Sequence, residues 1–164
     1  MKQEQFWIAC ISVLCLSGVG FSEASAQLGQ RPADEYIARM DRPERVANLH
    51  VDEVVERLQL SPGDIVADIG SGSGAFSIPM ARAIGPTGVL YPVDIDQEML
   101  NFVAERAAGE GLRNVRTVLG EYDDPKLPAN DVDVVFLHRT LHMIEHRQAY
   151  LNAAARYLKP DGRI

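Results

Sequence analysis

Glycine and acidic residues follow one another along a short segment in a pattern that suits a cofactor-binding loop. Gly70, Gly72 and Gly74 alternate with serines directly after an apolar run, and Asp68 lies two positions before the first glycine. Glycine lets a backbone approach a ligand where a Cβ would block it, and the helix that follows offers free N–H groups to a ligand. The segment therefore predicts a nucleotide-cofactor site.

Two kinds of cofactor use a loop of this type. Gly70, Gly72 and Ala75 satisfy the dinucleotide pattern G-x-G-x-x-G/A, and Asp94 lies near the spacing expected of an acid that binds a ribose. Asp68, however, places a negative charge beside the loop. A negative rim favours a cationic ligand and disfavours a pyrophosphate, so the charge separates the two interpretations.

The same stretch resembles the first motif of class I S-adenosylmethionine (SAM)-dependent methyltransferases, which has the form D-x-G-x-G-x-G. The resemblance covers residues 44–164 and is carried by four segments: D-I-G-S-G-S-G at 68–74, V-D-I-D-Q-E-M-L at 93–100, G-E at 120–121 before L-P, and Y-L-K-P-D-G-R at 157–163. It implies methyl transfer from SAM, and we expect a small-molecule acceptor. The alternatives are an NAD-dependent oxidoreductase and a non-catalytic SAM-binding fragment.

The chemistry of the residues agrees with the roles that the resemblance implies. A carboxylate at Asp94 is suited to accept hydrogen bonds from both ribose hydroxyls, and Ile95 offers an apolar face to the adenine. Asp68 would face the amino-acid end of SAM, and Glu121 stands where the family often has an aspartate near the adenine amino group. The expected cofactor-binding residues are Asp68, Gly70, Ser71, Gly72, Gly74, Asp94, Ile95 and Glu121.

Histidines follow the fourth apolar run, at the end of the sheet where open α/β folds bind ligands. If this stretch is helical, His138, His142 and His146 share one face, a geometry that could hold a metal or supply a base. No acid motif of a zinc enzyme accompanies them, and methyl transfer to a good nucleophile needs no metal, so we expect none. His138 or His142 is the candidate general base for an acceptor that must lose a proton.

The elements that position these residues alternate between helices and strands. A polar leader at 27–43 contains a short helix at 34–40, and the domain follows at 44–164. The patterns predict helices at 44–60, 75–84, 97–108 and 147–158 and strands at 65–69, 89–93, 115–119 and 132–137. This order predicts a doubly wound, Rossmann-like α/β fold with a parallel sheet. A fifth strand would open only at Gly162, so we expect a domain whose C-terminal strands are missing.

The first 26 residues differ from the rest of the chain. Residues 6–21 are almost uncharged and precede Ala24-Ser25-Ala26, a small-x-small pattern typical of a secretory signal that is cleaved after Ala26. The apolar part is shorter than the roughly 20 residues that a spanning helix needs. We expect an exported, periplasmic protein. The alternative is an uncleaved anchor that holds the domain at the membrane and facing the cytoplasm, where SAM is made.

Composition limits the possible partners. The 164 residues have a formal net charge of −7, which leaves no basic surface for a phosphate backbone and argues against nucleic acid. The remaining composition is that of one globular domain. Both cysteines lie within the first 26 residues, so the rest of the chain has no thiol for a disulfide, a metal site or a nucleophile. The sequence specifies neither the acceptor nor the oligomeric state.

Overall fold

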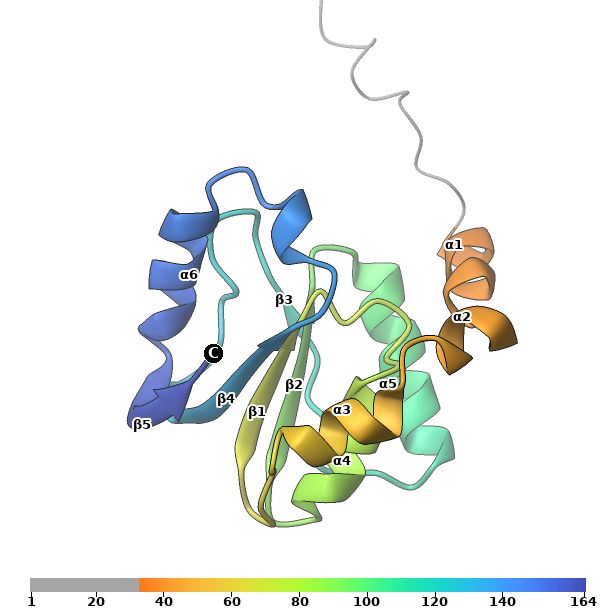
Figure 1. Ribbon diagram of the computed structural model, residues 1–164, viewed down its shortest axis with the longest axis horizontal. Helices are drawn as coiled ribbons and strands as arrows, with labels where there is room; N and C mark the ends of the chain where they lie inside the picture. Colours follow the sequence, from red (N-terminus) through yellow and green to blue (C-terminus); the bar gives the residue numbers. More distant parts are fainter. Residues whose placement is uncertain (1–32) are drawn as a thin grey trace, which may run out of the picture. The chain divides into compact units, whose positions relative to one another are not determined.

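A computed structural model describes residues 33–164, which form a parallel β-sheet flanked by helices (Figure 1). The sheet has five strands in the order β3-β2-β1-β4-β5, and every neighbouring pair is parallel. The strands are β1 Ile65–Ile69, β2 Val89–Asp94, β3 Val118–Leu119, β4 Val132–Leu137 and β5 Leu158–Arg163. The doubly wound, Rossmann-like fold predicted from the alternation of elements is confirmed.

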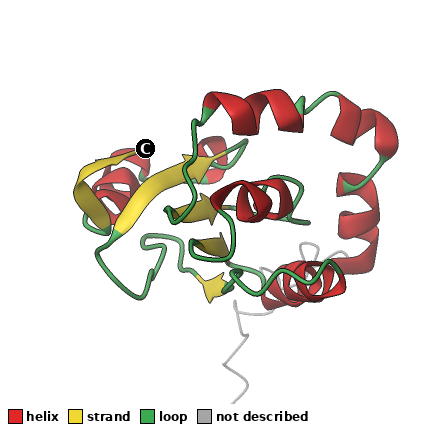
Figure 2. Ribbon diagram, turned by 90° about the horizontal axis from the view of Figure 1, so that it is seen from below, coloured by secondary structure: helices red, strands yellow, loops and turns green. Residues whose placement is uncertain are grey.

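Helices lie on both sides of this sheet (Figure 2). They are α1 Ala33–Met40, α2 Pro43–Ala47, α3 Val51–Arg57, α4 Ser77–Ile84, α5 Gln97–Gly109 and α6 Arg147–Ala155, with a short 3-10 helix η1 at Leu141–Met143. The connections from β1 to β2 and from β4 to β5 each pass through a helix, as parallel strands require.

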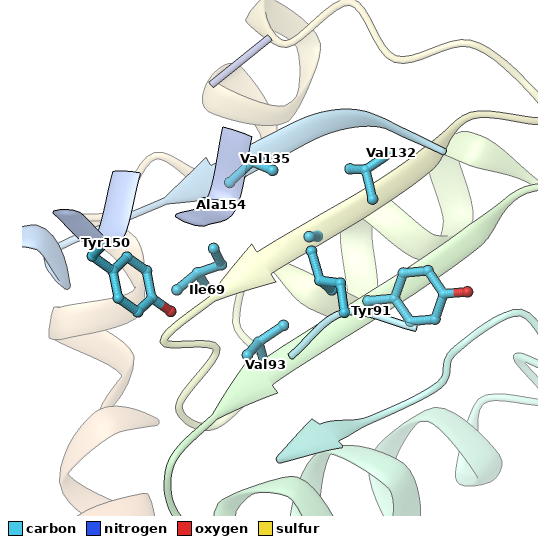
Figure 3. Packing of buried hydrophobic residues seen from close by; sticks show 9 residues of the cluster. Ile69, Tyr91, Val93, Val132, Val135, Tyr150 and Ala154 are labelled. Atoms are coloured by element: carbon cyan, nitrogen blue, oxygen red, sulfur yellow. The ribbon is translucent and has the colours of Figure 1, made fainter. Parts of the chain in front are cut away.

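Neighbouring residues of β1 point to opposite faces of the sheet, and each face has its own core. Val66 packs in a cluster with Met80 of α4, whereas Ala67 and Ile69 pack with Tyr150 of α6 (Figure 3). This alternation follows from the two-residue repeat of a strand. It places the next polar residue of β1, at position 68, on the same face as α4.

The prediction that the chain ends before a fifth strand is wrong. α6 ends at Ala155, earlier than expected, and β5 already begins at Leu158. The sequence pattern favours a turn here because Pro160 has no N–H to give to a sheet. Proline is tolerated in an edge strand, however, and the pairing with β4 shifts register between Val132 and Val134 to accommodate this stretch.

Two other predicted elements differ from the structure. The helix expected over 44–60 is divided into α2 and α3, because His50 adopts a left-handed backbone conformation with φ of 48°. A continuous right-handed helix cannot contain such a residue. The strand expected over 115–119 is reduced to β3, preceded by an isolated bridge between Leu90 and Val115.

The predicted signal segment, residues 1–26, lies outside the described residues, as do residues 27–32 of the predicted leader. The short helix expected in the leader is α1. Between residues 33 and 164, no helix is both long and apolar enough to cross a membrane.

Candidate functional site

The loop between β1 and α4 has a backbone that only glycine can follow easily. Gly70 and Gly72 have φ values of 72° and 53°, in the left-handed region. Space is also short, because a Cβ at Gly70 would overlap the side chain of Thr140, and one at Gly72 would lie 2.9 Å from the sulfur of Met40. Backbone conformation and close packing therefore both require glycine in this loop.

Asp68 is almost fully buried at the end of β1, with 3% of its surface exposed. The hydroxyl of Ser77, on the first turn of α4, donates a hydrogen bond to its Oδ2 at 2.5 Å. Burial raises the pKa of Asp68 to about 7, the Ser77 hydrogen bond opposes this rise, and the negative charge of Asp94 adds to it. A cation placed near this carboxyl group would favour its charged form.

Asp94 ends β2, and its carboxylate reaches across to the glycine loop. Its Oδ2 accepts a hydrogen bond from the N–H of Gly72 at 3.0 Å, and its Oδ1 accepts one from the N–H of Asp96 at 3.1 Å. Burial raises the pKa of Asp94, while these backbone N–H groups act in the opposite direction. Ile95, the next residue, exposes half of its surface. The structure thus brings the predicted acid, its apolar neighbour and the loop together.

Ser71 carries an unused hydrogen-bonding group inside this loop. Its side-chain oxygen is buried, and it has no hydrogen-bond partner in the part of the chain that the structure describes. The N–H groups of Gly70 and Ser71 both donate to the carbonyl of Val93, which ties the loop to β2. Buried polar groups are normally paired, so the Ser71 hydroxyl is available to a ligand.

Glu121 lies at the same edge of the sheet, but its carboxylate is engaged elsewhere. The preceding residue, Gly120, donates its N–H to the carbonyl of Asp94 at 2.9 Å, which places Glu121 next to the end of β2. Its own side chain is largely exposed and forms an ion pair with Lys126 at 3.2 Å. Glu121 is therefore near the loop without contacting it in this structure.

The continuous helix that would place three histidines on one face does not form. After β4 the chain bends at Arg139, which has φ of 55°, then forms η1, and α6 begins only after His146. The left-handed residue and the short 3-10 turn break the four-residue spacing that a continuous helix would give. Within residues 33–164 there is no group of three or more His, Cys, Asp or Glu side chains that could hold a metal ion.

His138 directly follows β4 and packs near the start of α4. Its ring packs against Phe76, which immediately precedes α4, with centroids 4.7 Å apart, and it is stacked parallel to Phe136 at 6.4 Å. Burial lowers the pKa of His138, and the positive charges of Arg139 and Arg45 lower it further. The imidazole is therefore neutral near pH 7 and able to accept a proton. His142, by contrast, is exposed on η1.

Sequence reasoning missed the contribution of residues 33–47, here called the strap, which comprises α1, α2 and the turn between them. Met40 covers Gly72, and Asp41 accepts a hydrogen bond from the hydroxyl of Ser73 at 2.6 Å. It also missed Thr140, which packs on Gly70 from the loop after β4. The strap gave no signal because its polar residues are those of an ordinary surface helix. Thr140 could have been found from its position in the loop after β4, at the carboxyl end of a parallel strand.

The strand order, the glycine loop after β1 and the acid at the end of β2 together define a Rossmann-like domain for a nucleotide cofactor. Residues 66–162 match the family described as the methyltransferase domain, and the chain belongs to this family.

Known proteins resemble the chain over most of the described region. Nocamycin O-methyltransferase of Saccharothrix syringae is 38% identical over 103 residues, which are 63% of this chain and 37% of that protein. The ubiquinone/menaquinone biosynthesis C-methyltransferase of Ectopseudomonas mendocina is 32% identical over 67% of this chain and 43% of its own length. The crystal structure of a SAM-dependent methyltransferase from Aquifex aeolicus superposes with a TM-score of 0.72 and 28% identity, covering 80% of this chain and 69% of that one.

These comparisons confirm the predicted class I SAM-dependent methyltransferase domain and SAM as its cofactor, in preference to NAD. The chain spans less than half of the length of the two curated relatives.

Proposed function

We propose that this domain binds SAM at the carboxyl ends of β1 and β2 and transfers its methyl group to a small-molecule acceptor. The observation that carries the proposal is the pair of carboxylates beside the glycine loop, the buried Asp68 and the partly exposed Asp94, in a chain of the methyltransferase family. SAM carries a sulfonium and an ammonium group, so negative charge beside this loop stabilises it.

The residues of the loop fit the parts of the cofactor. Asp94 is partly exposed at the end of β2, so its oxygens can accept hydrogen bonds from the ribose hydroxyls. These bonds can replace the one from the N–H of Gly72 or form beside it. Ile95 presents an exposed apolar face beside it for the adenine. The unpartnered hydroxyl of Ser71 supplies one further hydrogen bond. Glu121 reaches the adenine only if its ion pair with Lys126 opens.

Bound SAM supplies a methyl group on a positively charged sulfur, which is open to in-line attack by a nucleophile. The task of the protein is then to hold the acceptor in line and to exclude competing water. The loop after β4, with Thr140 packed on Gly70, borders the glycine loop, and its residues are therefore candidates for contacting the acceptor. A small acceptor agrees with the names of the two relatives, which refer to nocamycin and to ubiquinone/menaquinone.

His138 is the better of the two candidate bases. It is neutral near pH 7 because burial and two arginines lower its pKa, and its ring contacts Phe76, the last residue before α4. An acceptor hydroxyl or amine that must lose a proton could pass it to this imidazole. His142 is exposed on η1, where its backbone carbonyl accepts a hydrogen bond from Arg147.

Titration calorimetry tests the proposal. We expect the protein to bind SAM and its demethylated product, S-adenosylhomocysteine, at micromolar concentrations and not to bind NADH. Asp94→Ala should weaken SAM binding at least about tenfold, because it removes the acceptor for the ribose hydroxyls. If the protein bound NADH and did not bind SAM, the proposal would be refuted. Binding of SAM with no methyl transfer to any of a broad panel of small acceptors would favour a non-catalytic SAM-binding domain.

A further inference from the structure

The strap and the glycine loop are joined by a compact polar network. The hydroxyl of Ser73 donates to Oδ1 of Asp41 at 2.6 Å. Arg106, from α5, donates through Nη1 to the carbonyl of Ser73 at 3.2 Å and to Oδ2 of Asp41 at 3.4 Å. Ser73 is 2% exposed, so its hydroxyl has no access to bulk water as a substitute partner. Among the described residues, Asp41 is therefore the acid that satisfies this buried hydroxyl.

The network continues into the residues proposed to hold the ribose. Ser73 directly follows Gly72, and the N–H of Gly72 donates to Oδ2 of Asp94 at 3.0 Å. A change in the position of Ser73 would therefore displace Gly72 and alter its hydrogen bond to the carboxylate of Asp94. The side chain of Met40, next to Asp41 in the strap, packs against Gly72. Arg45 in turn donates to the carbonyl of Met40 at 2.9 Å and fixes the turn of the strap.

We propose that Asp41 is a positioning residue of the cofactor site. Its carboxylate holds Ser73 and Gly72 in the shape that receives SAM and keeps the strap closed over the loop once SAM is bound. The residue lies outside the segment that matches the family, which begins at position 66. The proposal rests on the proposed cofactor site, because it assigns Asp41 a role in the binding of SAM.

Stopped-flow and calorimetric measurements of SAM binding test this role. In Asp41→Asn the amide accepts hydrogen bonds only weakly in place of the carboxylate, so we expect SAM to bind about tenfold more weakly, mostly through faster dissociation. Glu44→Gln is the matched control, since it removes the same charge from an exposed position of the strap. It should leave the dissociation rate unchanged.

A double-mutant cycle separates this network from a general loss of stability. Ser73→Ala removes the same hydrogen bond from the other side, so its effect on SAM dissociation should not add to that of Asp41→Asn. Asp41→Glu, which keeps the charge, should bind SAM more tightly than Asp41→Asn does. A purely structural role predicts lower melting temperatures for these variants with an unchanged dissociation rate.

The possible outcomes distinguish this proposal from the proposed function. If the native chain does not bind SAM, the proposed function itself fails. If the native chain binds SAM, and Asp41→Asn releases it at the same rate as Glu44→Gln, only the role of Asp41 is refuted. Should Asp41→Asn fail to fold, Ser73→Ala carries the same test, and normal SAM dissociation from that variant refutes the role.

Discussion

The hydroxyl of Ser77 and the carboxyl group of Asp68 meet at 2.5 Å, beneath the glycine loop and on the α4 face of the sheet. This contact gives a buried acid one hydrogen bond and no cation, which leaves its pKa near 7. The protonation state of Asp68 therefore changes in the range where the protein would work, and this has consequences for stability and for SAM binding.

Asp68→Asn should remove a pH dependence from the stability. The pKa of Asp68 is raised from 3.8 to about 7 on folding, so its contribution is fully present below pH 3.8 and is lost as the pH rises to 7. Between pH 5 and pH 8, the free energy of unfolding of the native chain should fall by roughly 2–3 kcal/mol relative to that of Asp68→Asn. Urea unfolding at both pH values measures this difference. The exposed Asp161→Asn is the control, and a similar change in that variant would contradict the argument.

SAM binding at pH 7 should release a fraction of a proton. The sulfonium and ammonium groups favour the charged form of Asp68, so binding lowers its pKa and displaces the proton that it partly holds. Calorimetry in two buffers of different ionisation enthalpy measures the number of protons released. The release should shrink at pH 8.5, where Asp68 is already charged, and should disappear in Asp68→Asn. A release that persists in Asp68→Asn would assign it to another group.

Gly70→Ala should abolish SAM binding and destabilise the fold. The φ of 72° disfavours any Cβ, at a cost of about 1–3 kcal/mol, and the new methyl group would also overlap Thr140. Gly111 has the same φ, but no atom lies within 4 Å of the position that a Cβ would take there, so Gly111→Ala isolates the backbone cost. Denaturant unfolding should show the larger loss for Gly70→Ala. Equal losses in the two variants would show that the contact with Thr140 is not important.

His138→Ala should slow methyl transfer and leave SAM affinity unchanged, provided that the acceptor must lose a proton. In the native chain, the rate of methyl transfer should fall as the pH is lowered, because protonated His138 cannot act as a base. The fall should occur below the ordinary pKa of histidine, because the pKa of His138 is lowered. His142→Ala is the matched variant on η1 and should retain most of the rate. Once an acceptor is known, unchanged turnover in both variants would remove histidine from the mechanism.

We also propose that residues 1–26 direct export and are removed after Ala26. Expression of the full chain in a bacterial host, followed by fractionation and N-terminal sequencing, should yield a periplasmic protein that begins at Gln27. An intact N-terminus in the membrane fraction would instead support the anchor, with the domain on the side where SAM is made.

Most of the framework could be predicted from the sequence, because it depends on local patterns. β1 and β4 have the predicted bounds, since the length of each apolar run and the turn residues that flank it favour a strand over a helix. The glycine loop and Asp94 can be recognised because their spacing is a property of one unit, in which β1, the loop, α4 and β2 follow one another. The register shift that lets Pro160 enter β5 depends on its pairing with β4, which no local pattern shows.

The remaining differences arise from single backbone conformations and from contacts between distant segments. His50 and Arg139 are left-handed although their residue types do not demand it. His50 interrupts the helix predicted over 44–60, and Arg139 bends the chain after β4, before η1. The contact between Asp41 and Ser73 joins residues 32 positions apart in sequence. No spacing rule connects them, so the strap could be recognised only in three dimensions.

The position of Met40 over Gly72 has a practical consequence for how this protein is divided into parts. A boundary drawn at residue 66, where the segment that matches the family begins, would discard the strap and its contacts with Gly72 and Ser73. The shortest segment worth producing or grafting onto another scaffold therefore starts upstream of Met40. Substitutions in the strap would also change the residence time of the cofactor while the sequence of the glycine loop stays the same.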